Sequence, residues 1–514
     1  MPSPRVAIIG AGVAGLTAAI DLAGAGCEVI VLERAAAAGG KMREVRVGDD
    51  SLDAGPTVFT LRSVFDALFD DAGDNLDQRL RLIPATVLAR HAWSSKGAGT
   101  LDLFADLSRS VDAIGDFAGA AAAAAFRRFT SEAERVYRTL DASFMRAQRP
   151  TPFGLMRRLG VAGLPDLWAI KPFATLWASL GGHFDDHRLR QLFGRYATYC
   201  GSSPFSCPAT LMLVAHVEQA GVWYVEGGMR RLIDALGSLL LRRGATLRCR
   251  TEVRRIEVGR GRIRAVETAE GERIEVDAVV CNADNQALAA GLFGEAAARA
   301  VAATPPSARS LSAVTWNLVA QTSGFDLAHH SVFFSDDYAA EFSDIFARRR
   351  LPAQPTIYVC AQDRRDAEPP TRTDERLFFL INAPATGDIH EFNTAEMESC
   401  ANRVVDALRG YGLELRMGAH PPVVTSPSDF NRLFPATGGA LYGPASHGWQ
   451  ASFSRAGARS RVPGLYLAGG STHPGPGVPM AATSGRLAAA RILADFASTN
   501  RSRATAMSGG TSMR

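Results

Sequence analysis

Apolar runs of strand length alternate with a helical pattern at the start of the chain. Residues 6–10 (VAIIG) and 28–33 (EVIVLE) have the length and composition of buried strands, and the alanine-rich residues 12–25 between them favour a helix. Strand, helix and strand in this order form a βαβ unit, in which the two strands lie parallel. Two later apolar runs, residues 278–281 and 464–469, are typical of further strands buried in the same sheet.

The pattern changes in the middle of the chain. Residues 254–276 alternate polar and apolar positions in three runs separated by glycine-containing turns, which predicts an antiparallel meander. Residues 105–218 are rich in Ala, Leu, Phe and Arg with helical spacing. The predicted fold class is α/β in its main sheet and α+β for the whole chain, with a Rossmann-like nucleotide-binding domain and an inserted substrate domain. The expected division is a discontinuous nucleotide-binding domain over residues 1–105, 225–295 and 455–497, a helical region over 106–224 that faces a membrane or the substrate, a substrate domain over 296–454 and a disordered tail over 498–514.

Composition narrows the class of protein. Hydrophobic residues make up 47% of the chain and charged residues 21%, as in a folded globular protein. The net charge of +4 is too small to favour a nucleic-acid partner. Seven scattered cysteines without a C-x-x-C pair favour reduced thiols, so we expect neither disulfides nor a metal site. The N-terminus has no charged-then-apolar leader, and the charge-free stretches 196–217, 433–454 and 462–485 each contain prolines, so we expect no membrane-spanning helix.

The first turn of the chain carries a dinucleotide-binding pattern. Gly10, Gly12 and Gly15 form G-x-G-x-x-G between a predicted strand and a predicted helix. There they allow a tight turn, close approach to a pyrophosphate and close packing of the helix on the strand, and the helix N-terminus attracts the phosphate charge. Glu33 ends the second predicted strand, where a carboxylate accepts hydrogen bonds from a ribose. The sequence therefore predicts a bound dinucleotide.

Two further loops favour FAD over NAD. Gly39, Gly40 and Lys41 follow the acidic residue closely and suit a ligand that extends beyond one ribose. Residues 475–481 (GPGVPMA) open a helix near the C-terminus, and its dipole could stabilise the negative charge that develops at the flavin C2 carbonyl on reduction. An NAD enzyme of ordinary design needs no such returning segment. We therefore expect FAD as the cofactor.

Several motifs together resemble a known family. The N-terminal VAIIGAGVAGL, the ER, GGK and DAGPT segments that follow it, and the late LAGGSTHPGPGVPMA are similar to the phytoene-desaturase branch of the flavin amine oxidase superfamily. GVWYVEGGM at residues 221–229 and VVCNAD at 279–284 resemble two internal elements of that branch. Within the carotenoid desaturases, residues 182–229 are most similar to the 1-hydroxycarotenoid 3,4-desaturases (methoxyneurosporene dehydrogenase type) of purple bacteria.

The resemblance implies an activity and a set of cofactor contacts. The activity is FAD-dependent formation of C=C bonds in a carotenoid, with 3,4-desaturation of an acyclic 1-hydroxycarotenoid as the expected reaction. Lys41 stands where the family often has Arg, and Pro476 where it often has Gly, but a cation and a turn residue are retained. The implied FAD contacts are Gly10, Ala11, Gly12, Val13, Ala14, Gly15, Glu33, Arg34, Gly40, Lys41, Met42, Gly55, Pro56, Thr57, Val58, Val253, Gly470, Val478, Pro479, Met480 and Ala481.

Two side chains are candidates for a role beside the flavin. The flavin carries the hydride, so the protein needs at most an acid or base for the proton. His473 lies in the returning loop and is the candidate for proton transfer, with a structural or solvent-exposed histidine as the alternative. Glu226 lies beside Trp223 and Tyr224 and could meet a substrate hydroxyl, with a solvated turn carboxylate as the alternative. Trp223 itself could contact the substrate or pack in the core.

Residues 146–182 interleave apolar and aromatic side chains with Arg and Lys. This composition suits an interfacial segment on anionic lipid, with a buried helical pair and a basic rim as the alternative. We expect a peripheral protein on the cytoplasmic side of the inner membrane. Its expected partners are the membrane surface, a carotenoid and an electron acceptor, which is either a quinone or oxygen.

Other functions remain open at this point. Within the family they are a phytoene desaturase and a carotenoid isomerase. Outside it they are a flavin oxidase of a soluble amine and a non-enzymatic lipid-binding protein of the GDP-dissociation-inhibitor type, which resembles this architecture without flavin.

Overall fold

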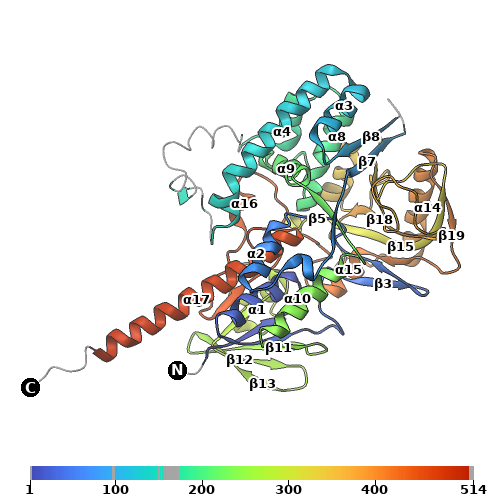
Figure 1. The fold of residues 1–514 in the computed structure, drawn as a ribbon. Coiled ribbons are helices and arrows are strands. Elements are labelled where there is room, and N and C mark those ends of the chain that lie inside the picture. The colour runs from blue at the N-terminus through green and yellow to red at the C-terminus, as the bar shows by residue number, and fades with distance from the viewer. Residues whose placement is uncertain are drawn as a thin grey trace, which may run out of the picture.

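The computed structural model describes residues 3–94, 99–148, 151, 153–154, 157, 171 and 173–508, and the side chains of 452 and 499–508 are left out of the description. A five-stranded parallel sheet forms the centre of the nucleotide-binding unit, in the lower part of Figure 1. Its strand order is β10-β2-β1-β14-β21. The four predicted apolar runs are strands β1 (Arg5–Ile9), β2 (Glu28–Leu32), β14 (Ala278–Cys281) and β21 (Leu465–Leu467) of this sheet, and the fifth strand, β10 (Thr246–Arg248), was not predicted.

Helices cover one face of this sheet and a small antiparallel sheet covers the other. Helices α1 and α17 pack so closely that a Cβ atom on Gly485 would lie 2.1 Å from the carbonyl oxygen of Ala14, so only glycine fits there. The small sheet is the predicted meander. The elements are α1 (Val13–Gly24), α2 (Ser63–Asp71), α10 (Arg230–Arg242) and α17 (Val478–Ser508) on the helical face, and β11 (Val253–Gly259), β12 (Arg262–Thr268) and β13 (Arg273–Glu275) on the other.

A second sheet, mostly antiparallel, forms the centre of the substrate unit. Its order is β19-β15-β18-β17-β16-β7-β8, with β20 paired to β15. Helix α14 (Thr394–Gly410) packs on one face through a core of Val, Leu, Ile and Phe side chains. The strands are β7 (Val87–Trp93), β8 (Gly99–Phe104), β15 (Ser312–Ser323), β16 (His330–Phe333), β17 (Ile357–Ala361), β18 (Glu375–Ala383), β19 (Glu414–Met417) and β20 (Val423–Thr425).

A helical unit, at the top of Figure 1, packs against this second sheet through a large aromatic core. Its helices are α3 (Leu107–Ala118), α4 (Ala120–Leu140), α7 (Leu176–His183), α8 (His187–Gly194) and α9 (Leu213–Gln219). Shorter elements connect the units. They are β3 (Glu44–Val47), β4 (Asp50–Asp53), β5 (Phe59–Thr60), β6 (Leu82–Pro84), β9 (Val222–Val225), α11 (Asn285–Ala289), α12 (Glu295–Ala298), α13 (Tyr338–Phe342), α15 (Pro427–Leu433) and α16 (Ala451–Ser454).

The structure differs from the sequence predictions at two boundaries. Residues 87–104 form β7 and β8, which belong to the second sheet because β7 pairs with β16 and β8 with β7, although the nucleotide-binding domain was expected to run to residue 105. An alternating pattern defines the buried face of a strand but not its partner strand, which explains the difference. The disorder expected from residue 498 is wrong for 498–508, which continue α17, and 509–514 lie outside the described residues. A helix nucleated by packing gains one hydrogen bond per added residue, which accounts for this extension.

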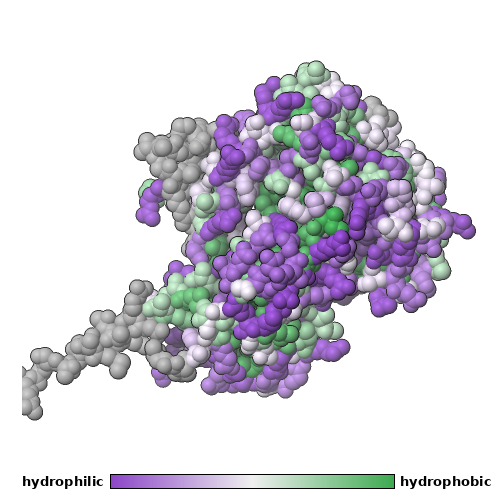
Figure 2. Space-filling view, in the orientation of Figure 1, coloured by the Kyte–Doolittle hydropathy of each residue, from purple (hydrophilic) through white to green (hydrophobic). Residues whose placement is uncertain are grey.

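The surface in Figure 2 is hydrophilic over most of this face, with a hydrophobic patch where α17 leaves the body of the molecule. Among the residues that the structure describes, none of the helices combines the length and the apolarity that a membrane span needs.

Candidate cofactor and substrate site

A cavity of about 2030 Å³ connects the first turn of the nucleotide-binding unit to the second sheet and the helical unit. Pockets for one small molecule usually have volumes of about 300–1,000 Å³. The cavity therefore has room for a cofactor and a second large molecule. Apolar side chains from the second sheet and the helical unit line the part beyond the nucleotide turn, and they are Leu140, Leu211, Leu213, Val214, Phe378 and Leu380.

The first turn is shaped to receive an anion. Helix α1 begins at the cavity wall with Gly12 as its N-cap, and no side chain caps it. The second glycine loop lies directly against this turn, because the Gly39 amide donates to the Ala11 carbonyl at 2.9 Å. A Cβ on Gly40 would lie 3.4 Å from the Cα of Gly12. Uncapped N–H groups at a helix N-terminus bind phosphate, so this observation fits the pyrophosphate of FAD.

Two backbone amides fix the orientation of the Glu33 carboxylate. Its Oε2 accepts a hydrogen bond from the Ala11 amide at 2.7 Å, and its Oε1 accepts one from the Ala35 amide at 2.8 Å. The carboxylate is buried and lines the cavity. Each oxygen keeps a lone pair that can accept from a ribose hydroxyl. Val253, one of the FAD contacts that the resemblance implies, also lines the cavity.

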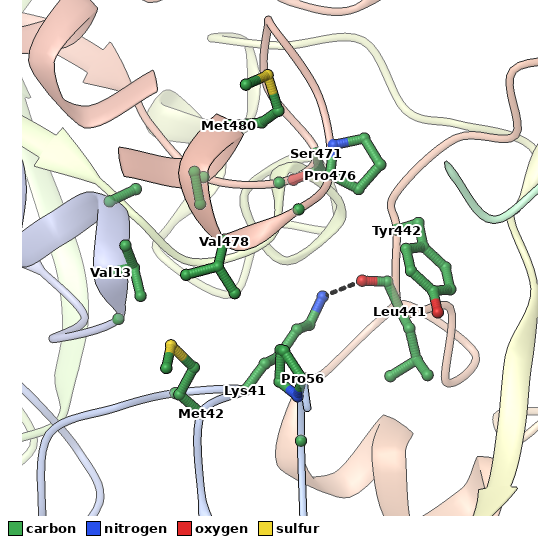
Figure 3. A pocket seen from close by; sticks show the side chains of 18 of the residues that line it. Val13, Lys41, Met42, Pro56, Leu441, Tyr442, Ser471, Pro476, Val478 and Met480 are labelled. Atoms are coloured by element: carbon green, nitrogen blue, oxygen red, sulfur yellow. Dashed lines mark hydrogen bonds between the residues drawn. The ribbon is translucent and has the colours of Figure 1, made fainter. Parts of the chain in front are cut away.

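Lys41 points into the cavity between the first turn and the returning helix, as Figure 3 shows. Its ammonium donates to the carbonyl oxygen of Leu441 at 2.5 Å. Burial lowers the pKa of Lys41, because the charged form loses its hydration. An anionic ligand in the cavity would favour the charged form again. Val478 of α17 faces Lys41 from the opposite side, and Met480 lines the cavity farther along the same helix.

Asp53 fixes the loop that contains Gly55 and Thr57 between the two units. Its carboxylate accepts hydrogen bonds from the amides of Met229 at 2.7 Å and Arg230 at 3.3 Å, at the start of α10. Its own backbone carbonyl accepts from the side chains of Asn317 at 2.9 Å and Gln362 at 3.0 Å, in the substrate unit. Burial raises the pKa of Asp53 to about 6, although the two amide bonds oppose that rise.

Of the residues predicted to contact FAD, all except Ala11 and Gly15 line the cavity. Those two support the turn from behind. Ala11 is fully buried and donates to Glu33, and a Cβ on Gly15 would lie 2.1 Å from the carbonyl oxygen of Gly10. Their contribution is therefore to the shape of the turn.

His473 lies outside the cavity lining, although proton transfer was its predicted role. Its imidazole is buried, and its Nε2 donates to the carbonyl of Phe144 at 3.0 Å. Its backbone amide donates to the carbonyl of Ala456 at 2.8 Å. Burial lowers the pKa of His473 to about 4, so the ring stays neutral near pH 7. This geometry favours the structural alternative, in which His473 ties the returning loop to the helical unit.

Glu226 also lies outside the cavity lining. Its side chain is 43% exposed and forms ion pairs with Arg81 at 3.4 Å and Arg365 at 3.6 Å. Trp223 packs on the core of the nucleotide-binding unit. The geometry thus favours a solvated carboxylate for Glu226 and core packing for Trp223. The residue types and the motif do not show which way these two side chains point.

The sequence did not predict four polar side chains that lie in the otherwise apolar part of the cavity. Arg195, Tyr199, Glu218 and Tyr358 all line it. One signal was available, since Arg195 and Glu218 stand directly before and after the charge-free residues 196–217. A charge at each end of such a stretch can mark the place where an apolar segment meets a polar site.

One group of side chains could hold a metal ion, although the sequence predicted none. His329, His330 and Cys360 place their ligand atoms within 4.8 Å of one another. Each already has a protein partner, because His329 Nε2 lies 3.5 Å from the Cys360 sulfur and His330 Nδ1 lies 2.7 Å from the Tyr358 hydroxyl.

The fold and the uncapped turn define a flavin-dependent oxidoreductase. The chain belongs to the flavin containing amine oxidoreductase family, which it matches over residues 13–493, and its cofactor is FAD. The predicted family, fold class and cofactor are thereby confirmed.

Individual relatives match this chain over nearly its whole length. The chain is 51% identical over 510 residues to the hydroxyneurosporene desaturase of Rubrivivax gelatinosus, with 99% of this chain and 97% of the relative covered. It is 44% identical over 501 residues to the protein of the same name from Cereibacter sphaeroides, covering 97% of this chain and 99% of that one. Among solved structures, putrescine oxidase bound to putrescine has a TM-score of 0.59 and 16% identity, with 96% of this chain and 99% of that chain covered. At this identity the structural likeness shows the fold alone.

Proposed function

We propose that this protein is an FAD-dependent desaturase that introduces C=C bonds into a carotenoid, with the 3,4 bond of an acyclic 1-hydroxycarotenoid as its target. The observation that carries the proposal is the continuous cavity, which joins a dinucleotide groove to a long apolar chamber. The relatives that match over nearly their whole length and are named hydroxyneurosporene desaturase support it.

Forming a C=C bond removes a hydride and a proton from neighbouring carbons. FAD, when bound in this groove, would supply the two-electron acceptor. The residues that would hold it are those that line the groove, with the turn at Gly12 on the pyrophosphate, Glu33 on the ribose and the start of α17 near the flavin ring. The apolar side chains of the chamber align the chain of the substrate and exclude water from the reacting carbons. Neither His473 nor Glu226 lies in the cavity wall, so we assign the proton to neither.

The test of this proposal is a spectral assay. The purified protein is incubated with FAD in liposomes that contain an acyclic carotenoid, either with or without a terminal hydroxyl. Each reaction is run once under air and once without oxygen but with an added quinone. We expect the absorption of the hydroxylated carotenoid to shift to longer wavelength, because each new double bond extends the conjugation. The comparison of air and quinone identifies the electron acceptor. Unchanged spectra for every carotenoid, or rapid oxidation of a soluble amine, would contradict the proposal.

A peripheral position on the cytoplasmic side of the inner membrane is the second part of the proposal. Phe173 and Trp449 both line the cavity, and their side chains are 69% and 42% exposed. Their rings contact each other in a T-shaped pair with centroids 5.4 Å apart. Exposed aromatic side chains at the opening of an apolar cavity suit insertion into the lipid interface. Most of the predicted interfacial segment, residues 146–182, lies outside the described residues.

The double substitution Phe173→Ser with Trp449→Ser should weaken membrane binding. Burying one large apolar side chain contributes about 1.5–3 kcal/mol, so losing two should lower the liposome partition coefficient at least about tenfold. Flotation with anionic liposomes measures the effect. Ile389→Ser is the matched control, because Ile389 is also 69% exposed but does not line the cavity. Equal loss of binding in both variants would contradict a docking role for the cavity opening.

A further inference from the structure

The cavity wall formed by the helical unit contains a cluster of hydrogen-bonded polar side chains, here named the Arg195 cluster (Arg195, Tyr199 and Glu218). Nη1 of Arg195 donates to the Tyr199 hydroxyl at 2.8 Å, and that hydroxyl donates to Oε1 of Glu218 at 3.2 Å. The hydroxyl of Tyr196 donates to the other carboxylate oxygen. Arg195 and Tyr199 lie on the 3-10 helix η4 (Arg195–Cys200) and Glu218 on α9. Two neighbouring elements therefore build the cluster.

The cluster is rigid. The guanidinium of Arg195 lies over the ring of Tyr199 at 5.1 Å and over the ring of Tyr358 at 5.3 Å. Two ring contacts and a hydrogen bond fix the plane of a side chain that is otherwise flexible. Glu218 is buried at 6% exposure, and burial raises its pKa while the phenol bonds and Arg195 oppose that rise. Burying a cation next to a carboxylate costs free energy of folding unless hydrogen bonds satisfy both charged groups.

The hydrogen-bonding capacity of the cluster is not used up. A guanidinium has five N–H donors, and within the part of the chain that the structure describes only the Tyr199 hydroxyl accepts from Arg195. Each Glu218 oxygen accepts one phenol and keeps a lone pair. Since Arg195 and Glu218 both line the cavity, the cluster offers a ligand a donor and an acceptor side by side. A hydroxyl group both accepts and donates, whereas a carboxylate or an ammonium would meet a like charge.

The cluster is also connected to the loop predicted to contact the flavin. Tyr358, whose ring lies against Arg195, shares a hydrogen bond of 2.7 Å with the hydroxyl of Thr57. Thr57 belongs to the Gly55–Val58 stretch that lines the cavity. In a 1-hydroxycarotenoid the C3–C4 bond begins only two bonds away from the hydroxylated carbon. A hydroxyl bound at the cluster would thus keep that bond close to the Thr57 loop.

We propose that the Arg195 cluster binds the terminal hydroxyl of the substrate and makes the enzyme select hydroxylated acyclic polyenes over the corresponding hydrocarbons. Arg195 donates a hydrogen bond to the hydroxyl oxygen, Glu218 accepts a hydrogen bond from the hydroxyl, and Tyr199 positions both side chains. A hydrocarbon end fills the same space without these bonds and leaves buried polar groups unpaired, which is a strong basis for rejection. This inference rests on the proposed function, whose carotenoid substrate it specifies further, and it moves the hydroxyl contact expected at Glu226 to Glu218.

The experiment compares hydroxyneurosporene with neurosporene in wild type, Arg195→Met and Tyr199→Phe, all loaded with FAD. Binding to detergent-solubilised enzyme is followed by quenching of tryptophan fluorescence, and kcat/KM is measured in liposomes. We expect Kd for the hydroxylated substrate to rise about 10- to 100-fold in Arg195→Met, since hydrogen bonds to charged groups contribute about 1.5–3 kcal/mol. A smaller rise is expected in Tyr199→Phe, and Kd for the hydrocarbon should stay within about threefold of wild type. Arg109→Met is the matched control, because Arg109 is exposed and contacts the ring of Phe104.

The outcomes separate this inference from the proposed function. Wild type that binds and dehydrogenates both carotenoids equally, or an Arg195→Met variant that keeps the wild-type preference, would overturn the inference and leave the desaturase proposal standing. Wild type that dehydrogenates neither carotenoid would refute the desaturase itself. A purely structural cluster predicts equal weakening for both ligands, which also contradicts hydroxyl recognition. If Arg195→Met does not fold, Tyr199→Phe decides, because it removes one hydroxyl and keeps the charge pair.

Discussion

Gly12→Val should yield a folded protein that is almost free of flavin. The backbone at Gly12 has φ −74°, which any residue adopts, and a Cβ there would meet only the Asn282 side-chain amide at 3.0 Å, which can move. The rest of the valine side chain would occupy the space in front of the uncapped N-terminus of α1. We expect Kd for FAD to rise at least about 100-fold, equivalent to about 3 kcal/mol. Flavin absorbance per protein after gel filtration, and titration of the apoprotein, measure the change.

Gly237→Val is the matched control for this prediction. Gly237 lies within α10, and a Cβ there would have no neighbouring atom within 4 Å. This variant should retain wild-type flavin content. Full flavin content in Gly12→Val would show that the first turn does not hold the pyrophosphate, and the proposed function would lose its cofactor site.

Arg364→Ala should lower the free energy of unfolding by about 3–5 kcal/mol, because it leaves a carboxylate buried without its cation. Glu375 is 1% exposed, and its two oxygens accept from Nε of Arg364 at 2.6 Å and from Nη2 at 2.9 Å. Arg364 also donates to the Leu327 carbonyl at 2.9 Å, so it ties β18 to the loop before β16. Denaturant titration, with circular dichroism as the readout, measures the loss.

Arg409→Ala tests whether burial of the ion pair causes the loss of stability expected in Arg364→Ala. Arg409 is 55% exposed and pairs with Asp406 at 3.0 Å, so its loss should cost less than about 1 kcal/mol. The double variant Arg364→Met with Glu375→Leu should recover much of the stability lost in Arg364→Ala, because it removes both charges. Similar losses in Arg364→Ala and Arg409→Ala would argue against a buried ion pair that stabilises the second sheet.

Local patterns allowed the nucleotide-binding unit to be predicted from the sequence. The βαβ unit and the meander each depend on periodicity and turns within a short segment. The cofactor groove follows from them, since glycine turns and an acidic residue at the end of a strand have one common arrangement. For this reason nearly all of the predicted FAD contacts line a single cavity.

Long-range pairing could not be predicted in the same way. The pairing of β7 with β16 joins segments far apart in the chain, and nothing in either segment identifies its partner. The contact between Tyr358 and the Arg195 cluster has the same origin, because Tyr358 reaches Arg195 through the packing of the second sheet on the helical unit. His473 and Glu226 lie in motifs that were identified correctly, but the direction of each side chain depends on partners such as Phe144 and Arg81.

The order of strands in the parallel sheet has a consequence for synthesis of the protein. Strand β21 forms one edge of that sheet, and α17 covers the face of α1, yet both follow residue 464. A ribosome synthesises these elements long after the N-terminal glycine turn, so that turn waits through translation of more than 400 residues before its flavin-binding surroundings are complete. Until then the apolar faces of α1 and β14 stay available to chaperones, and the complete flavin site can form only after β21 and α17 have been made.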